Sequence, residues 1–319
     1  MEKSSPVISV IMGVYKEPEH WLCQSIDSIR HQSFADLEFI IVFDNPQYPE
    51  GLSLLKKYAD IDHRIVLIVN EENLGLTKSL NRGLSVAKGK YIARMDADDI
   101  SMPNRFKLQY QYMETHPEVV VLGTNIKYIG RKAWLKRNDS IRFDDDSIKA
   151  QMLLMNCMAH STVFIRKSVL DETGITYDES FRQSQDYRLW ELLRPYGKFA
   201  VLREKLLKYR ISDQQITKSQ TKGQANLADS VRFRLQKNWL NENGVVFNDE
   251  DLKSYPFRII ERIRFNSIIN DTLEYKAFLQ YAYLLSGDSS WTMLSLLKYD
   301  IRKMPVLNIM RLLVRSIKW

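Results

Sequence analysis

The segment Tyr91-Ile-Ala-Arg-Met-Asp-Ala-Asp-Asp99 is a β-forming run that ends in three aspartates. Its apolar half is typical of a strand buried on both faces, which predicts a strand over residues 90–95. Acidic residues directly after a buried strand lie at its carboxyl end, where ligands bind in doubly wound sheets. The segment therefore predicts both a central strand and a polar site at its end.

Apolar β-forming runs and helical patterns alternate on both sides of this segment. Further strands are predicted at residues 7–14, 37–43, 64–69, 119–122, 162–165, 199–202 and 206–211, and helices at 18–32, 76–88, 103–116 and 184–194. This alternation predicts an α/β fold, a Rossmann-like and mostly parallel sheet with helices on both faces. We expect one domain over residues 1–216, a solvated loop at Asp144–Asp146 and a helical region over 217–319.

Composition excludes several classes of protein. The chain has 319 residues, is 45% hydrophobic and carries a net charge of +7. Residues 298–319 hold six cations against one acid, so the rest is close to neutral, which argues against a nucleic-acid binder. Two cysteines, Cys23 and Cys157, rule out a disulfide framework and favour a reducing compartment. No apolar run reaches the length of a membrane span, and residues 1–6 lack the apolar stretch of a secretory signal.

The phosphate-binding motifs of other α/β enzymes are absent. Neither Gly-x-Gly-x-x-Gly nor Gly-x-x-x-x-Gly-Lys occurs, which disfavours dinucleotide dehydrogenases and P-loop nucleotidases. A divalent cation on carboxylates is the simplest other way to neutralise a phosphate. Asp96 and Asp98 lie two apart after a strand and are candidate ligands for Mn²⁺ or Mg²⁺. The alternative is that these acids cap the helix starting near Pro103.

An ordered set of motifs resembles the family 2 glycosyltransferases of the GT-A fold over residues 6–215. The motifs are Val7-Ile-Ser-Val-Ile-Met-Gly-Val-Tyr15, Glu38-Phe-Ile-Ile-Val-Phe-Asp44, Asn73-Leu-Gly-Leu-Thr-Lys-Ser-Leu-Asn81, Ala87-Lys-Gly-Lys-Tyr-Ile-Ala-Arg-Met-Asp-Ala-Asp-Asp99, Ala159-His-Ser-Thr-Val-Phe-Ile-Arg166, Gln185-Asp-Tyr-Arg-Leu-Trp190 and Tyr209-Arg-Ile211. The resemblance implies a nucleotide-sugar half at about 1–125 and an acceptor half at about 126–216. Two positions depart from the family pattern, since Phe43 and Gln185 stand where acidic residues are common.

The resemblance also implies roles for single residues. Asp186 would be the general base, Asp98 would ligate the metal, Asp96 would hold the ribose or the metal, and Asp44 would contact the nucleotide base. The full set implied to bind the nucleotide-sugar is Val14, Tyr15, Asp44, Asn73, Gly75, Lys78, Asp96, Ala97, Asp98, His160 and Arg210.

Several of these residues have structural alternatives. Asp186 has an ion pair with Arg182 or Arg188 as its alternative. For His160 the alternative is a packed position in the core, and for Arg210 it is a structural role at a strand end. For Asn73 and Gly75 the alternative is that they only start a helix.

These features predict an inverting glycosyltransferase that moves a sugar, with a UDP-linked donor expected, to a glycan or lipid-linked acceptor. The expected setting is capsule, O-antigen or lipopolysaccharide assembly. One alternative is a catalytically inactive nucleotide-sugar-binding or membrane scaffold protein, which intact Asp96, Asp98 and Asp186 disfavour. Another is a nucleotidyltransferase, which usually has a Gly- and Arg/Lys-rich loop after its first strand, where this chain has Tyr15-Lys-Glu-Pro18.

The last residues carry a separate pattern. Apolar residues recur at three- and four-residue steps at Leu307, Met310, Val314 and Ile317, and cations recur on another face at Arg311, Arg315 and Lys318. A basic amphipathic helix of this kind lies on anionic membranes. We therefore expect a cytoplasmic protein at the inner face of the plasma membrane. The alternative is a terminal helix that packs on the protein.

Overall fold

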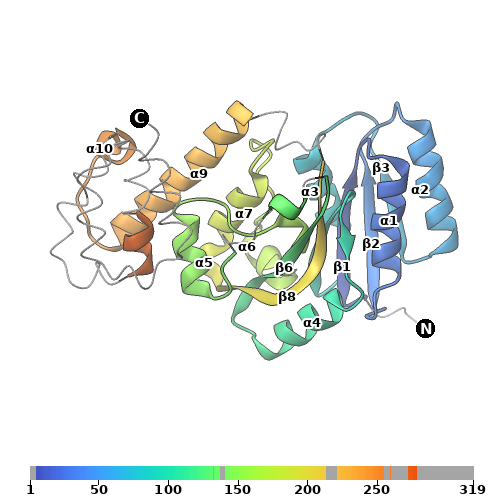
Figure 1. The fold of residues 1–319 in the computed structure, drawn as a ribbon, viewed down its shortest axis with the longest axis horizontal. Coiled ribbons are helices and arrows are strands. Elements are labelled where there is room, and N and C mark those ends of the chain that lie inside the picture. Colours follow the sequence, from blue (N-terminus) through green and yellow to red (C-terminus); the bar gives the residue numbers. More distant parts are fainter. Residues whose placement is uncertain are drawn as a thin grey trace. The chain divides into compact units, whose positions relative to one another are not determined.

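The computed structural model describes residues 5–131, 133–136, 141–212, 221–254, 259 and 272–278 (Figure 1). The chain divides into two compact units, residues 1–149 with 155–231, and residues 150–154 with 232–319. The predicted boundary between 216 and 217 lies outside the described residues, as does the basic segment 298–319, and both stay predictions. No helix in the described ranges combines the length and the apolar character needed to cross a bilayer.

The first unit contains one sheet of eight strands. The strands are β1 (Ile8–Val14), β2 (Leu37–Phe43), β3 (Ile65–Val69), β4 (Tyr91–Asp96), β5 (Ile100–Ser101), β6 (Val119–Gly130), β7 (Phe164–Arg166) and β8 (Lys198–Ile211). Their order is β3-β2-β1-β4-β7-β6-β8-β5. The pairs among β1 to β4 are parallel, as is β6 with β8, while β7 is antiparallel to both β4 and β6. The predicted α/β class with a mostly parallel sheet is confirmed.

Helices connect the strands and continue after the sheet. They are α1 (Glu19–Arg30), α2 (Pro49–Ile61), α3 (Leu76–Val86), α4 (Arg105–Thr115), α5 (Asp145–Met152), α6 (Lys167–Thr173), α7 (Gln185–Leu193), α9 (Thr221–Glu242) and α10 (Asp249–Ser254). Short 3-10 turns lie at η1 (Ala133–Leu135), η2 (His160–Thr162) and η3 (Arg194–Tyr196). The four predicted helices correspond to α1, α3, α4 and α7.

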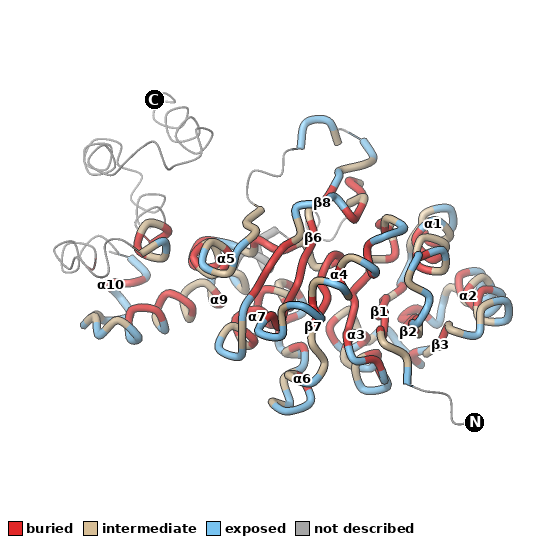
Figure 2. Tube along the Cα trace, turned by 90° about the horizontal axis from the view of Figure 1, so that it is seen from below, coloured by how far each residue is buried: buried red, intermediate tan, exposed pale blue. Residues whose placement is uncertain are grey.

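Both faces of the central strands are buried, which explains why their sequences do not alternate (Figure 2). Val10 and Met12 of β1 share one apolar cluster with residues of α1, α2 and α4. Ile11 points to the other face, where its side chain lies against Gly83 of α3. Helices therefore cover both faces, and one apolar run supplies two layers of core.

Two predictions from the local pattern are wrong. Asp144–Asp146 is not a solvated loop, because Asp145 opens α5 and Asp144 Oδ1 accepts a hydrogen bond from the Ser147 N–H at 2.9 Å, as a residue before a helix does. The strands expected at 199–202 and 206–211 are the single strand β8. The exposed stretch 203–205 separates the two apolar runs, and register shifts with β6 around Asn125 accommodate it.

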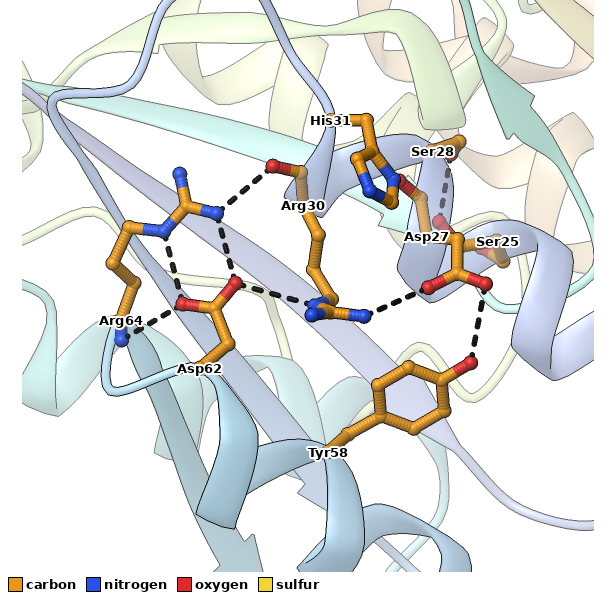
Figure 3. Close-up of polar contacts among 8 residues, drawn as sticks. All are labelled: Ser25, Asp27, Ser28, Arg30, His31, Tyr58, Asp62 and Arg64. Carbon is orange, nitrogen blue, oxygen red and sulfur yellow. Dashed lines mark hydrogen bonds and ion pairs between the residues drawn. The ribbon is translucent and has the colours of Figure 1, made fainter.

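The sequence analysis also missed α2 and the two-residue strand β5. The helix α2 is held to α1 by a polar network at its end (Figure 3). Asp62 binds Arg30 Nε at 3.2 Å and Arg64 Nη2 at 2.8 Å, and Tyr58 Oη donates to Asp27 at 3.3 Å. The two arginines lower the pKa of Asp62 from 3.8 to about 2, Arg64 contributing most.

We predict that Asp62→Asn lowers the free energy of unfolding by about 2 kcal/mol near neutral pH, since one pKa unit corresponds to about 1.4 kcal/mol. A lowered folded-state pKa adds stability above the unfolded-state pKa, and this is lost as the pH falls through the folded value. The difference between variant and wild type should therefore shrink between about pH 4 and pH 2. Urea unfolding across pH measures it. Asp60→Asn, an exposed acid of α2, is the control, and an equal loss in both variants would contradict the network's role.

Candidate active site

The acidic turn after β4 is held from three sides. Ser25 Oγ of α1 donates to the Asp96 carbonyl at 2.8 Å, and the Asp96 N–H donates to Ser161 Oγ of η2 at 2.9 Å. The third contact comes from β8, where the Arg210 N–H donates to Asp99 Oδ1 at 2.8 Å. Asp99 is buried, so its carboxylate serves as an internal anchor and Asp96 and Asp98 remain partly exposed.

Arg210 lies beside this turn, although 111 residues separate it from Asp99. Its Nε donates to the Asp98 carbonyl at 2.6 Å, and its Nη2 donates to Gln24 Oε1 at 2.7 Å. Its guanidinium also stacks over the Trp21 ring, 5.0 Å from the centroid. The tertiary structure thus brings this predicted binding residue to the acidic turn, where its hydrogen bonds hold the backbone in place.

The acids of the site carry more negative charge than nearby cations offset. Buried Arg94 forms an ion pair with Asp96. Burial, followed by the charges of Asp96 and Glu17, raises the pKa of Asp98 to about 7. Burial chiefly raises the pKa of Glu17 and of Asp99 as well, and the charge of Asp96 adds to both shifts. The strand-end acids therefore form a site of unbalanced negative charge.

This donor set fits a divalent cation. No group of three or more His, Cys, Asp or Glu side chains within the described part of the chain is arranged to hold a metal. Mg²⁺ and Mn²⁺ do not require one, because they are commonly bound through one or two carboxylates plus substrate phosphate oxygens. Asp98 and Asp96 are the residues present that would hold such a cation.

The other predicted donor-side residues follow β1, β2 and β3 at the same sheet edge. Asp44 is buried, and its carboxylate accepts hydrogen bonds from Asn70 Nδ2 at 2.6 Å and from the N–H groups of Leu74 and Gly75 at 2.8 Å. Gly75 has a φ of +83°, and its N–H also donates to Asn73 Oδ1 at 3.0 Å. Asp44 therefore holds the turn that begins α3.

Three more predicted donor-side positions differ in how far they reach solvent. Val14 is buried at the end of β1, while the neighbouring Tyr15 is 47% exposed. Lys78 lies on the exposed side of α3.

Asp186 lies in the first turn of α7 and keeps part of its surface exposed. Asn156 Nδ2 donates to its Oδ2 at 2.6 Å, and the Tyr187 N–H donates to its Oδ1 at 2.8 Å. Burial raises its pKa, and the charge of Asp96 adds to the rise. Arg188, one of the two predicted alternative partners, instead pairs with Asp178 at 3.2 Å and with Glu191 at 2.8 Å.

His160 lies between aromatic side chains. Its Nε2 is 2.7 Å from Tyr177 Oη, and its ring meets those of Tyr177 and Trp190 edge-on. Burial and the charge of Arg94 hold its pKa well below the ordinary value. The imidazole is therefore neutral and forms part of the wall that supports α7.

Three residues of the site were missed by sequence reasoning. Glu17 follows the end of β1, so the strand-end rule that selected Asp96 also applied to it. Arg94 lies inside the quoted motif, two residues before the Asp96 with which it pairs. Asn156 carried no signal, because only the fold brings it to Asp186, 30 residues away.

A family model described as Glycosyl transferase family 2 matches residues 9–174. The chain belongs to glycosyltransferase family 2. An uncharacterized glycosyltransferase of Methanocaldococcus jannaschii is 35% identical over 76% of this chain and 82% of its own length. The O-antigen biosynthesis glycosyltransferase WbnJ of Escherichia coli is 34% identical over 67% of this chain and 83% of its own.

Solved structures share the fold. S. aureus TarS 1–349 in complex with UDP-GlcNAc aligns with a TM-score of 0.58 and 17% identity, over 86% of this chain and 81% of that one. The mannosyltransferase PcManGT from Pyrobaculum calidifontis, in complex with GDP-Man and Mn²⁺, aligns with a TM-score of 0.54 and 13% identity, over 98% and 87%. The predicted family, GT-A fold and glycosyltransferase class of enzyme are confirmed.

We predict that Asp98→Asn raises the melting temperature of this family 2 glycosyltransferase without metal, by about 2–4 °C at about pH 8. A carboxyl with a raised folded-state pKa contributes stability that is fully present below its unfolded value of 3.8 and is lost as the pH rises from there through about 7. Below about pH 4 the wild-type carboxyl is protonated in both the folded and the unfolded protein, so the two melting temperatures should converge there. Asp146→Asn, an exposed acid of α5, is the control. A more stable wild type at the higher pH would contradict the raised pKa.

Proposed function

We propose that this glycosyltransferase moves a sugar from a nucleotide-sugar, UDP-linked by expectation, to a hydroxyl of a glycan or lipid-linked acceptor, with inversion. The observation that carries the proposal is the placement of Asp186. Its carboxylate is partly buried, is oriented by Asn156 and Tyr187, and feels the charge of Asp96 across the site. A carboxylate held in this way is suited to act as a general base.

The chemistry follows from these groups. Asp186 takes the proton of the acceptor hydroxyl while the hydroxyl oxygen forms its bond to the anomeric carbon. The bond from that carbon to the donor phosphate breaks, and its electron pair leaves with the nucleoside diphosphate. A single displacement assisted by one base gives inversion at the anomeric carbon. The raised pKa of Asp186 brings its basicity nearer to neutral pH, where a general base is most effective.

The donor is expected at the edge formed by the ends of β1 to β4, where Asp44, Asn73 and Gly75 shape the start of α3 and Asp96 and Asp98 follow β4. Asp98 and Asp96 would hold Mn²⁺ or Mg²⁺. A bound cation supplies positive charge that stabilises the developing diphosphate. One structural neighbour holds UDP-GlcNAc and another holds GDP-Man with Mn²⁺, which supports a nucleotide-sugar donor. Whether that nucleotide contains uridine or guanosine is left to experiment.

The class of acceptor is proposed from the names of the relatives and from the basic pattern over residues 298–319. Relatives named for amylovoran and O-antigen biosynthesis support a role in surface polysaccharide assembly. The basic pattern over residues 298–319 supports contact with the inner face of the plasma membrane, where a lipid-linked acceptor would be presented.

We predict that Asp186→Asn lowers kcat by roughly 10²-fold or more, because the acceptor proton loses its base. Affinity for the donor should stay near the wild-type value. In the wild type, kcat/KM should fall on the acid side at a pH above the ordinary aspartate value of 3.8, since burial raises this pKa. The variant should lack that acid limb.

Asp171→Asn, an exposed acid of α6, is the matched control and should keep wild-type rates. A loss of donor affinity equal to the loss of kcat would place Asp186 on the nucleotide side. Product with a retained anomeric configuration would reject the single displacement.

The proposed reaction is tested by the release of nucleoside diphosphate from a panel of UDP-, GDP- and TDP-linked sugars. We predict that release requires Mn²⁺ or Mg²⁺ and stops with a chelator. Asp98→Asn should abolish both turnover and the stabilisation of the protein by donor plus metal, because the amide is a poor ligand for a hard cation. Full activity after chelation would remove the metal from the proposal, and no release from any donor would favour a catalytically inactive protein.

A further inference from the structure

A short segment that follows β6 exposes large apolar side chains. In η1, the Trp134 side chain is 83% exposed and the Leu135 side chain is 56% exposed. Figure 2 shows the chain beyond the end of β6 as a mostly exposed arc that stands away from the sheet. Exposing a tryptophan and a leucine side by side is unfavourable in water, which indicates a surface that is covered in use.

Cations flank these two side chains in the sequence. Residues 127–137 contain five cations and no acid, at Lys127, Arg131, Lys132, Lys136 and Arg137. In the parallel pair of β6 with β8, Lys127 is the register partner of Lys208. Like charges placed side by side on neighbouring strands repel each other. An anionic partner would remove that repulsion.

The segment lies at the same edge of the sheet as the acidic turn. Since β7 is antiparallel to both β4 and β6, β4 and β6 run in the same direction. Their carboxyl ends therefore meet one edge, where the acidic turn begins at Asp96 of β4 and Arg131 and Ala133–Lys136 follow β6. A surface that docks here would lie beside the opening of the site.

We propose that Arg131 and Ala133–Lys136 after β6, the basic-aromatic loop, form together with Lys127 of β6 a contact surface for an anionic lipid bilayer. Trp134 and Leu135 enter the interfacial layer, where a tryptophan ring has both an apolar body and a polar N–H. Lys127, Arg131 and Lys136 meet the lipid phosphates. A neutral glycan would use the tryptophan face but has no use for Leu135 or for a run of cations, and an anionic glycan would still leave Leu135 in water, so the lipid surface fits better. This inference goes beyond the proposed transferase reaction and requires no turnover.

The test is binding of the full chain to vesicles of phosphatidylcholine, with and without phosphatidylglycerol, in the absence of donor. To remove any contribution of the last residues, it is run in the Arg311→Gln, Arg315→Gln, Lys318→Gln background. We expect binding that depends on phosphatidylglycerol and weakens at high salt. Adding Trp134→Ala and Leu135→Ser should weaken it about tenfold or more, because two apolar side chains no longer leave water.

Quenching by brominated lipids gives a local readout. The fluorescence of the background protein should be quenched more than that of its Trp134→Phe variant, which keeps a ring that can insert. Tyr196→Ala is the matched control, since Tyr196 is 52% exposed in η3. It lies just before the start of β8, whereas the basic-aromatic loop lies beside the end of that strand. The Tyr196→Ala variant should bind vesicles like the background protein.

Three results would overturn the proposal. The background protein ignores anionic vesicles, it binds neutral and anionic vesicles equally, or the change at Trp134 and Leu135 has no more effect than Tyr196→Ala. If vesicles have no effect but a soluble glycan quenches Trp134, the loop belongs to the acceptor site instead. Since none of these measurements uses the transferase reaction, they stand apart from the test of the proposed function.

Discussion

The site depends on the hydrogen bond from the Arg210 backbone to the buried carboxylate of Asp99. Burying a carboxylate is costly, and this contact offsets part of that cost while it joins the turn after β4 to β8, next to the pair of β5 with β8. With Ser25 and Ser161 it fixes the backbone of the turn. The turn can therefore present Asp96 and Asp98 partly to solvent, close enough for their charges to repel each other.

That repulsion bears on what the turn can bind. Burial, followed by the charges of Asp96 and Glu17, raises the pKa of Asp98 to about 7. Asp96 has one cationic partner, Arg94, and its charge also contributes to the raised pKa of Asp186. The nucleotide-facing acids and the candidate base are therefore coupled electrostatically. A cation held by Asp96 and Asp98 would lower the pKa of Asp98 and also that of Asp186.

Much of the fold could be predicted because buried parallel strands need apolar side chains on both faces. That requirement makes β1, β2 and β4 visible as unbroken runs. The helix α2 was missed, and two of the contacts that hold it, from Tyr58 to Asp27 and from Asp62 to Arg30, are made with α1 and leave no local pattern in the sequence. β8 was divided into two strands because its exposed middle, residues 203–205, resembles a turn when neighbouring strands are unknown.

The sequence by itself determined the α/β class, the family and the candidate residues Asp96, Asp98 and Asp186, because strand ends and motif order are local properties of the chain. Only the tertiary structure decided which residues share a site. It placed Arg210 on the Asp99 turn, Asn156 on Asp186, and Trp134 at the edge where β4 ends. The first two of these are contacts between positions 111 and 30 residues apart. Such pairs are selected by strand order and direction in the folded sheet, which no local pattern of residues encodes.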